Sequence, residues 1–307
     1  MIVLREQTGR LRASVRGVVP VLATVLVVYL GVYLLAPTFG GTIVGIHETI
    51  GLLSFFLGQV GIYLVAIVGG LWMAMRMDRG SLARFGLDVD RQWLRNAAVG
   101  FTISLFATAA YFGYGATSGY LTLHPGRIGE FGEAGLTLGL TVIALSLASI
   151  LVANVWEEVV FRGVALQNFA EGLDARGYSP LFAIGLGVVV HAVLFGLYHV
   201  PTHGVFALYT ALVGVLFAFA YLLTGRLGLA IGIHFGRFPM ELLQGEALGP
   251  VTLPAVYEVV GTSLVGAFEL FAIEFVVTVG LLSVWVFHTR GSIGIDDRVL
   301  DLSTAEP

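Results

Sequence analysis

The chain has 307 residues, of which 57% are hydrophobic and only 12% are charged. A soluble domain carries about 25% charged residues, and a mean hydropathy of +0.91 points the same way. These values exclude ordinary globular and disordered proteins, and the absence of Cys excludes a disulfide framework. Long apolar runs indicate membrane-spanning helices rather than the alternating pattern of a transmembrane barrel. The net charge of −4 is too small to suggest a nucleic-acid partner.

Eight apolar segments are long enough to cross a bilayer, which needs about 20 residues per helix. In chain order they cover 18–36, 52–75, 97–114, 136–156 with an extension to about 167, 181–200, 205–224, 227–243 and 262–287. We therefore expect an all-α fold, a polytopic integral membrane bundle of about eight transmembrane helices.

All 16 basic residues are Arg, and their positions set the expected orientation. Arg residues cluster in the N-terminal tail and after the second span, and others lie in alternate loops and in the C-terminal tail. The opposite loops hold little beyond Arg127. Because basic loops stay in the cytoplasm, we expect a multi-pass cell-membrane protein with both termini cytoplasmic. We expect the first span to be a retained anchor rather than a signal peptide.

We expect the chain to form a single membrane domain, which can be divided into successive parts by its spans. Its expected parts are a cytoplasmic tail at 1–17, three helices over 18–135 with an Arg-rich cytoplasmic loop at 76–96, a core of four helices at 136–245, the last helix with its preceding loop at 246–290, and a cytoplasmic tail at 291–307.

Ionisable side chains inside membrane spans are costly, so they are candidates for function. The densest group is Glu157, Glu158 and Arg162. Glu158 precedes Arg162 by four residues, the favourable order for an ion pair on a helix. Glu157 lies about 100° round the helix from Glu158 and is free to face a cavity. The alternative is that these charges only mark the cytoplasmic end of the fourth span.

A second group is Phe195 and His199, at the end of an apolar helix shortly before Pro201. The alternative here is a packing or interfacial His. A third candidate, His234, lies half a turn away from a row of glycines spaced by four, at 228, 232 and 236. A helix face without side chains lets another helix approach closely, so His234 could project into a site at that contact.

The three groups in this order resemble the CPBP family of intramembrane proteases, which includes the type II CAAX prenyl endopeptidases and the bacteriocin-immunity (Abi) proteins. The resemblance covers about 138–245. It implies that Glu157 activates a water molecule and that Glu158 and Arg162 support it. It also implies that Phe195 with His199 forms a second motif and that His234 begins a third.

The third motif departs from the family pattern, which has Asn or Asp four residues after the His. Phe238 stands at that position, and either Arg237 or Glu241 could substitute. Otherwise this member has an altered specificity or is inactive. The family resemblance also leaves a metal open: Glu157, His199 and His234 are candidate Zn²⁺ ligands, because two His and one Glu form a known catalytic set. The sequence itself requires no metal.

Helical rise creates a difficulty for this site. If span four ends near 167, Glu157 lies about 15 Å deep, whereas His199, late in span five, lies near the opposite face. Span five must then begin outside the hydrocarbon, tilt or break. On the last span, which holds Glu269 and Glu274, we expect Glu269 to neutralise Arg237.

The favoured hypothesis is an intramembrane endopeptidase that hydrolyses a peptide bond with a Glu-activated water supported by two His. Its substrate would be a peptide or protein, lipidated in some members of the family. One alternative is a secondary transporter that uses intramembrane Glu, His and Arg. Another is a non-catalytic immunity or binding protein on the same fold, encouraged by Phe238. The sequence specifies neither the substrate nor the oligomeric state.

Overall fold

The computed structural model describes residues 11–35, 46–125, 135–242, 247–248, 251–252, 257–260 and 264–301, and most of these residues are helical. The α-helices are α1 (Ala13–Leu35), α2 (Ile46–Asp78), α3 (Arg91–Ser118), α4 (Gly135–Glu157), α5 (Gln167–Asp174), α6 (Pro180–His203), α7 (Ala207–Leu222), α8 (Leu227–Leu242), α9 (Leu264–Arg290) and α10 (Asp297–Leu300). Two 3₁₀ turns, η2 (Leu82–Phe85) and η5 (Gly204–Phe206), and a π-helix, η4 (Glu158–Leu166), lie between them. The predicted all-α class is confirmed.

Four short strands were not predicted. Strand β1 (Thr122–Pro125) pairs antiparallel with β4 (Tyr257–Val260), and β2 (Ala247–Leu248) pairs with β3 (Val251–Thr252). The first pair joins the segment after α3 to the segment before α9, so it ties two distant connections together.

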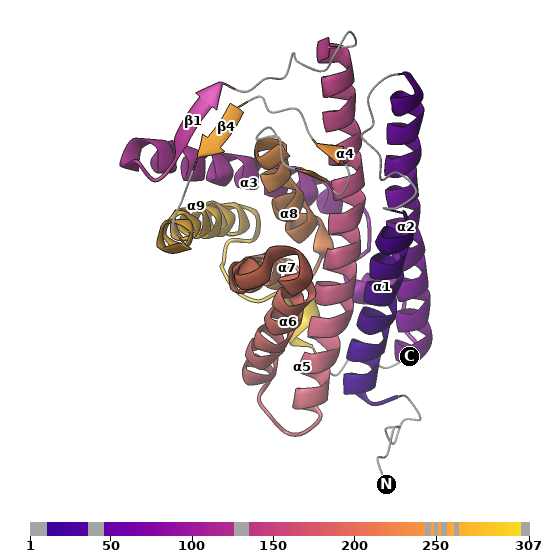
Figure 1. Ribbon diagram of the computed structural model, residues 1–307. Coiled ribbons are helices and arrows are strands. Elements are labelled where there is room, and N and C mark those ends of the chain that lie inside the picture. The colour runs from indigo at the N-terminus through magenta and orange to yellow at the C-terminus, as the bar shows by residue number, and fades with distance from the viewer. Residues whose placement is uncertain are drawn as a thin grey trace.

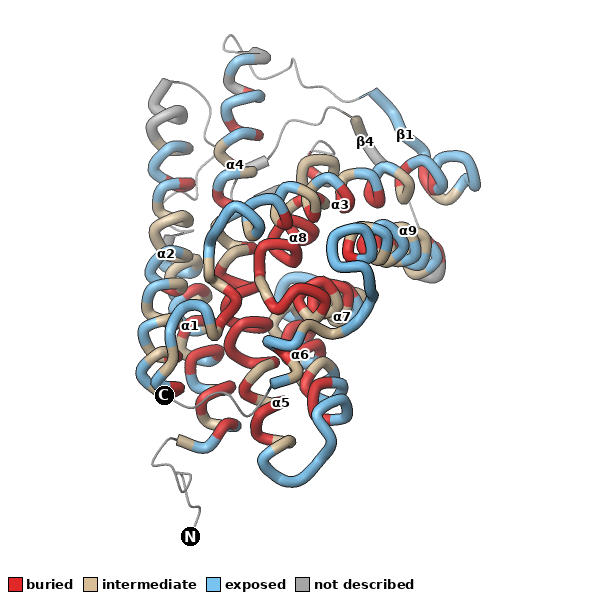
Figure 2. The backbone as a smooth tube through the Cα atoms, turned by 180° about the vertical axis from the view of Figure 1, so that it is seen from behind, coloured by how far each residue is buried: buried red, intermediate tan, exposed pale blue. Residues whose placement is uncertain are grey.

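The long helices α1, α2 and α4 stand side by side, and α5 continues the line of α4 (Figure 1). Helices α6, α7 and α8 lie beside this row, with α9 on the far side from α1 and α2. Figure 2 shows the buried stretches gathered at the centre of the molecule, where α6, α7 and α8 meet. The main hydrophobic core lies there and includes Trp156, Phe161, Phe195 and Phe217.

Six helical stretches in the described residues are long and apolar enough to cross a membrane. They are Ala13–Leu34, Leu53–Asp78, Arg91–Ser118, Gly139–Asp174, Pro180–Leu222 and Gly266–Arg290. The predicted count of eight is not confirmed. The expected fifth and sixth spans form one stretch because only η5 separates α6 from α7, and α8 has 16 residues, fewer than a span usually needs.

The outer surface is apolar, as a protein in a bilayer requires. On α1, Leu22, Leu26 and Leu30 follow one another at helical spacing and are 60%, 58% and 50% exposed. A stripe of this kind on a soluble protein would be an aggregation hazard, but it is the normal lipid-facing surface of a membrane helix. The chain is a multi-pass membrane protein.

The glycine row on α8 packs against α3, and the predicted close helix approach is confirmed. A methyl group at Gly232 would collide with the carbonyl oxygen of Ala97, and one at Gly236 with that of Phe101. The contact is mutual, since a methyl group at Gly100 of α3 would meet the backbone of Leu229. The absence of side chains on both faces lets α8 lie directly on α3.

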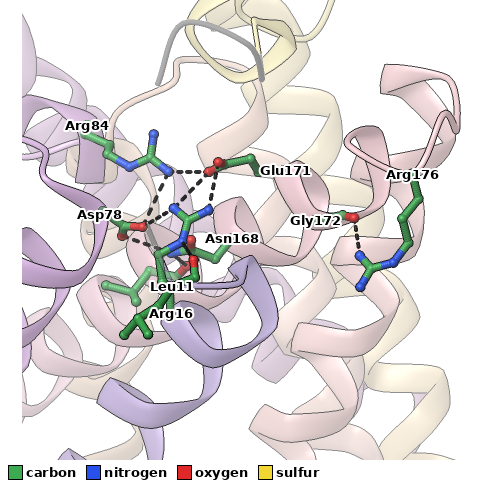
Figure 3. A network of polar contacts seen from close by, with 9 residues as sticks. Leu11, Arg16, Asp78, Arg84, Asn168, Glu171, Gly172 and Arg176 are labelled. Atoms are coloured by element: carbon green, nitrogen blue, oxygen red, sulfur yellow. Dashed lines mark hydrogen bonds and ion pairs between the residues drawn. The ribbon is translucent and has the colours of Figure 1, made fainter. Parts of the chain in front are cut away.

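A buried ionic network joins α1 to α2, η2 and α5 (Figure 3). The Arg16 guanidinium pairs with Asp78 and, at 2.8 Å, with Glu171. Arg84 binds the other oxygen of Glu171 at 2.6 Å, and Asn168 donates to Asp78 at 3.1 Å. Arg16 was expected in the N-terminal tail, but α1 already begins at Ala13 and the Arg16 side chain is 0% exposed. Its neutralisation by two carboxylates makes that burial tolerable.

The expected cytoplasmic loop at 76–96 is largely helical. Helix α2 runs to Asp78 and α3 begins at Arg91, with the Asp90 side chain capping it by accepting from the Trp93 N–H. Within this connection Asp88 pairs with Arg226 at 2.6 Å and with Arg298 at 3.0 Å. The connection after α2, the one after α7 and the C-terminal segment therefore meet on one side of the protein.

Candidate active site

The first group of candidate residues, Glu157, Glu158 and Arg162, lies where an α-helix changes to a π-helix. Glu157 is the last residue of α4, and Glu158 is the first residue of η4, a nine-residue π-helix that is buried throughout. Helices with i→i+5 bonding are rare and are frequently found at functional sites. No local pattern in the sequence distinguishes this π-helix from the ordinary α-helix that was predicted here.

The long run through η4 and α5 removes the depth difficulty. The fourth span does not end near 167 but continues to Asp174, so the expected end of this span was wrong. By helical rise, Glu157 lies about 25 Å from the turn at the end of α5, and His199 lies a similar distance up α6 from its start at Pro180. The two helices form a hairpin, and both residues stand at the same height on its two arms.

The Glu158 carboxylate links three side chains in the interior. Its Oε1 accepts from Arg162 Nη1 at 3.0 Å and from His234 Nδ1 at 2.8 Å. Both Glu158 and Arg162 are 0% exposed. The ion pair expected from the spacing is present, and it also reaches α8, which the spacing could not reveal.

The Arg162 guanidinium is enclosed by aromatic rings. It lies 4.3 Å from the centre of the Phe195 ring and 5.1 Å from that of Phe217, and it donates to the Gly214 carbonyl at 3.3 Å. A cation over aromatic faces is stabilised by the ring quadrupoles. Phe195 therefore supports the buried charge, which gives the second motif a physical reason for its Phe.

His199 and His234 approach Glu157 from two helices. His199 Nε2 lies 4.0 Å from Glu157 Oε1, and His234 Nε2 lies 3.6 Å from Glu157 Oε2. Each ring uses its other nitrogen to hold its orientation: His199 Nδ1 donates to the Phe195 carbonyl at 2.8 Å, and His234 Nδ1 donates to Glu158. These bonds place the proton of a neutral imidazole on Nδ1 and leave Nε2 as an acceptor facing Glu157.

Phe217 also fixes the orientation of the His234 ring. The two rings stack with centres 4.2 Å apart. Phe217 lies in an apolar run on α7 with no polar neighbour, as does Gly214, so no sequence signal marked either of them.

Phe238, at the position of the family Asn or Asp, lies against the His234 ring at 5.9 Å and packs on the small core around Phe55 and Phe56. It supplies no hydrogen bond. Arg237 binds Glu274 through Nε at 2.8 Å and the Tyr209 hydroxyl at 2.6 Å. The Glu241 side chain lies outside the described residues.

The expected partner of Arg237 was wrong. Glu274, which is 2% exposed, neutralises Arg237, whereas Glu269 lies beside the Tyr120 hydroxyl. Both carboxylates are on α9, and Glu274 is the one that reaches Arg237 of α8 and Tyr209 of α7.

Glu157, His199 and His234 are also the predicted candidate Zn²⁺ ligands. Imidazoles held through Nδ1 with Nε2 free to coordinate are typical of metal ligands. In the part of the chain that the structure describes, however, no group of three or more His, Asp and Glu side chains is arranged so as to hold a metal ion.

Comparison with known families gives a match in the middle of the chain. Residues 139–237 match the family model described as type II CAAX prenyl endopeptidase Rce1-like. This stretch, about one third of the chain, is similar to that family. This match confirms the resemblance and covers η4, α5, α6 and α7 entirely, together with most of α4 and α8. No curated protein and no solved structure matches the chain.

Proposed function

We propose that the chain is an intramembrane endopeptidase of the CAAX type, in which Glu157 activates a water molecule. The observation that carries this proposal is that His199 and His234 each present Nε2 to a different oxygen of the Glu157 carboxylate, at 4.0 and 3.6 Å. Such separations are too long for direct hydrogen bonds and suit a bridging water. The Rce1-like domain supports a CAAX-type intramembrane protease at the level of the family.

Charge balance supports the division of roles between the two carboxylates. Glu158 and Arg162 form a neutral couple. Glu157, His199 and His234 together carry no net charge when they share one proton beyond those of the neutral imidazoles. This avoids the cost of a net buried charge. With that proton on His234, Glu157 is an ionised base, and Glu158 stabilises the imidazolium through its Nδ1–H.

The proposed reaction follows from this state. Glu157 takes a proton from the water as the water oxygen bonds to the carbonyl carbon. The carbonyl oxygen becomes an oxyanion and accepts a hydrogen bond from the Nε2–H of protonated His234. The carbon–nitrogen bond then breaks as Glu157 gives its proton to the leaving nitrogen. His199 Nε2 accepts a hydrogen bond from the attacking water and holds it in place.

We further propose a cell-membrane location with both termini in the cytoplasm, because the Arg-bearing connections meet on one side of the protein. The substrate would be a peptide or protein that reaches the site from the bilayer. Lipid-modified peptides are the first class to test.

Cleavage by the full chain in lipid vesicles tests the proposal. The substrates are peptides ending in a prenylated Cys motif and matched peptides without the lipid, with products identified by mass spectrometry. Glu157→Gln should reduce the cleavage rate by about 10²–10⁴-fold, the usual contribution of a general base. Glu269→Gln is the matched control, since this exposed carboxylate lies outside the site. Equal rates in the two variants would refute the role of Glu157.

Phe238 is the observation that favours a non-catalytic immunity or binding role as the second candidate. Restoring the family residue with Phe238→Asn distinguishes the two. Cleavage by the natural chain supports the peptidase. Binding without cleavage, with cleavage gained only in Phe238→Asn, supports the binding role. Ion-driven flux that survives Glu157→Gln would instead support a transporter.

A further inference from the structure

A polar pocket of about 560 Å³ lies away from the candidate active site, where the start of α3, the end of α9 and the α7–α8 connection meet. Its lining holds four Arg side chains from separate segments of the chain, together with His288: Arg95, Arg226, Arg290 and Arg298. The mechanism above uses none of them.

The pocket has an excess of positive charge. Its carboxylates are Asp90 and Asp296, and Asp88 lies behind them as a partner of both Arg226 and Arg298. Arg226 also pairs with Asp90 at 2.7 Å, and Arg290 pairs with Asp296 at 3.2 Å. These three carboxylates pair with Arg226, Arg290 and Arg298, and with Arg95 the pocket holds one more Arg than it has carboxylates.

Arg95 is the cation best placed for a ligand. Its guanidinium lies 4.7 Å from the centre of the Trp285 ring, and no carboxylate of the described residues lies within ion-pair distance of it. Stacking uses the flat face of the guanidinium, so the N–H groups at its edge remain available. A fork of donors of this kind matches the oxygens of a phosphate group.

The pocket also lies at a membrane boundary. Arg95 is in the first turns of the candidate span Arg91–Ser118, and Trp285 and Arg290 are in the last turns of Gly266–Arg290. Trp and Arg at the ends of spans lie at the level of the lipid headgroups. Basic pockets between transmembrane helices at this level suit anionic headgroups.

We propose that this pocket binds a phosphate group, carried either by an anionic lipid headgroup or by a soluble phosphate compound. Arg95 is its principal contact, and Asp90 opposes it. The Trp93 N–H and Arg226 hold the pKa of Asp90 below its usual value, so Asp90 is ionised at neutral pH and its amide variant removes a full negative charge.

The test uses the full chain in a neutral detergent. One arm titrates phosphatidylglycerol and phosphatidylcholine by native mass spectrometry, and the other titrates inorganic phosphate by calorimetry. Arg95→Gln should weaken phosphatidylglycerol binding about five-fold, the contribution of one basic residue near anionic lipid. Arg91→Gln is the matched control, one helical turn earlier on α3, exposed and outside the pocket. It should change nothing.

Asp90→Asn is an independent variant, and its expected effect on binding is opposite to that of Arg95→Gln. Asn caps a helix as well as Asp, so α3 keeps its cap while the pocket loses a negative charge, and binding should tighten by a few-fold. If Arg95→Gln weakens binding only in the lipid titration, the ligand is a lipid headgroup. If it weakens the binding of inorganic phosphate, the ligand is a soluble phosphate compound. Equal binding of both lipids with no phosphate binding, or equal effects of Arg95→Gln and Arg91→Gln, would overturn the proposal.

Discussion

His234 Nδ1 lies 2.8 Å from Glu158 Oε1, the same oxygen that accepts from Arg162. One carboxylate oxygen thus holds an imidazole from α8 and a guanidinium from its own helix. Because Glu158 fixes the His234 ring, Nε2 of that ring faces Glu157. Glu158 therefore positions the site, and Glu157 remains available for chemistry.

Glu158→Gln should destabilise the protein by about 3–5 kcal/mol, because it leaves the buried Arg162 guanidinium without a counter-charge. Denaturant unfolding in detergent measures this loss. The double variant Glu158→Leu with Arg162→Met should recover much of it, since apolar side chains can replace a buried pair. Additive losses in the double variant would show that the two residues do not act as a pair.

Gly232→Ala should destabilise the protein by about 1–3 kcal/mol and lower cleavage, because the added methyl forces α8 away from the Ala97 carbonyl and displaces His234. Gly69→Ala is the control. It adds the same methyl to α2, where nothing lies within 4 Å, and should be neutral or stabilising by up to about 1 kcal/mol. Similar losses in both variants would mean that the contact with the Ala97 carbonyl does not explain the effect.

Glu274→Gln should destabilise the protein by about 1.5–3 kcal/mol, because the Arg237 guanidinium loses its charged acceptor. The matched change Glu269→Gln, on the same helix, should have little effect on unfolding. A double variant of Arg237→Gln with Glu274→Gln should be more stable than the sum of the single losses predicts. If Glu269→Gln lowers the free energy of unfolding more than Glu274→Gln does, the pairing of Arg237 with Glu274 is incorrect.

Metal removal tests whether the side chains suffice. We expect cleavage to survive dialysis against a chelator, and elemental analysis of the purified chain to give well under one zinc per protein. One equivalent of zinc that disappears in both His199→Ala and His234→Ala would contradict the reaction proposed above. It would require a rearrangement that brings Glu157 and the two imidazoles closer together.

Local spacing was enough to predict some features. The four-residue step from Glu158 to Arg162 forms an ion pair in the π-helix as it would in an α-helix, because the side chains are long enough to absorb the difference. The glycine row on α8 predicts a close helix contact, because a face without side chains lets any neighbouring helix approach closely, whichever helix that is.

Features that depend on distant segments could not be predicted. The height of His199 relative to Glu157 depends on where the fourth span ends, and the apolar pattern continues past the expected end without a break. The choice of Glu274 over Glu269 depends on the rotation of α9 about its axis. Arg16 was predicted to lie in a solvated tail because it is close to the N-terminus. Its partners lie 62 and 155 residues further along the chain, so no local pattern reveals them.

Those separations also set an order of assembly. During synthesis, Arg16 emerges long before Asp78 and longer still before Glu171, so α1 enters the membrane with an unneutralised guanidinium near its end. Asp78 can neutralise that charge once α2 has been made, but the second carboxylate, Glu171, is added only with α5. We therefore expect the final docking of the first helix to be a late step, which depends on the helix that follows Glu157 and Glu158.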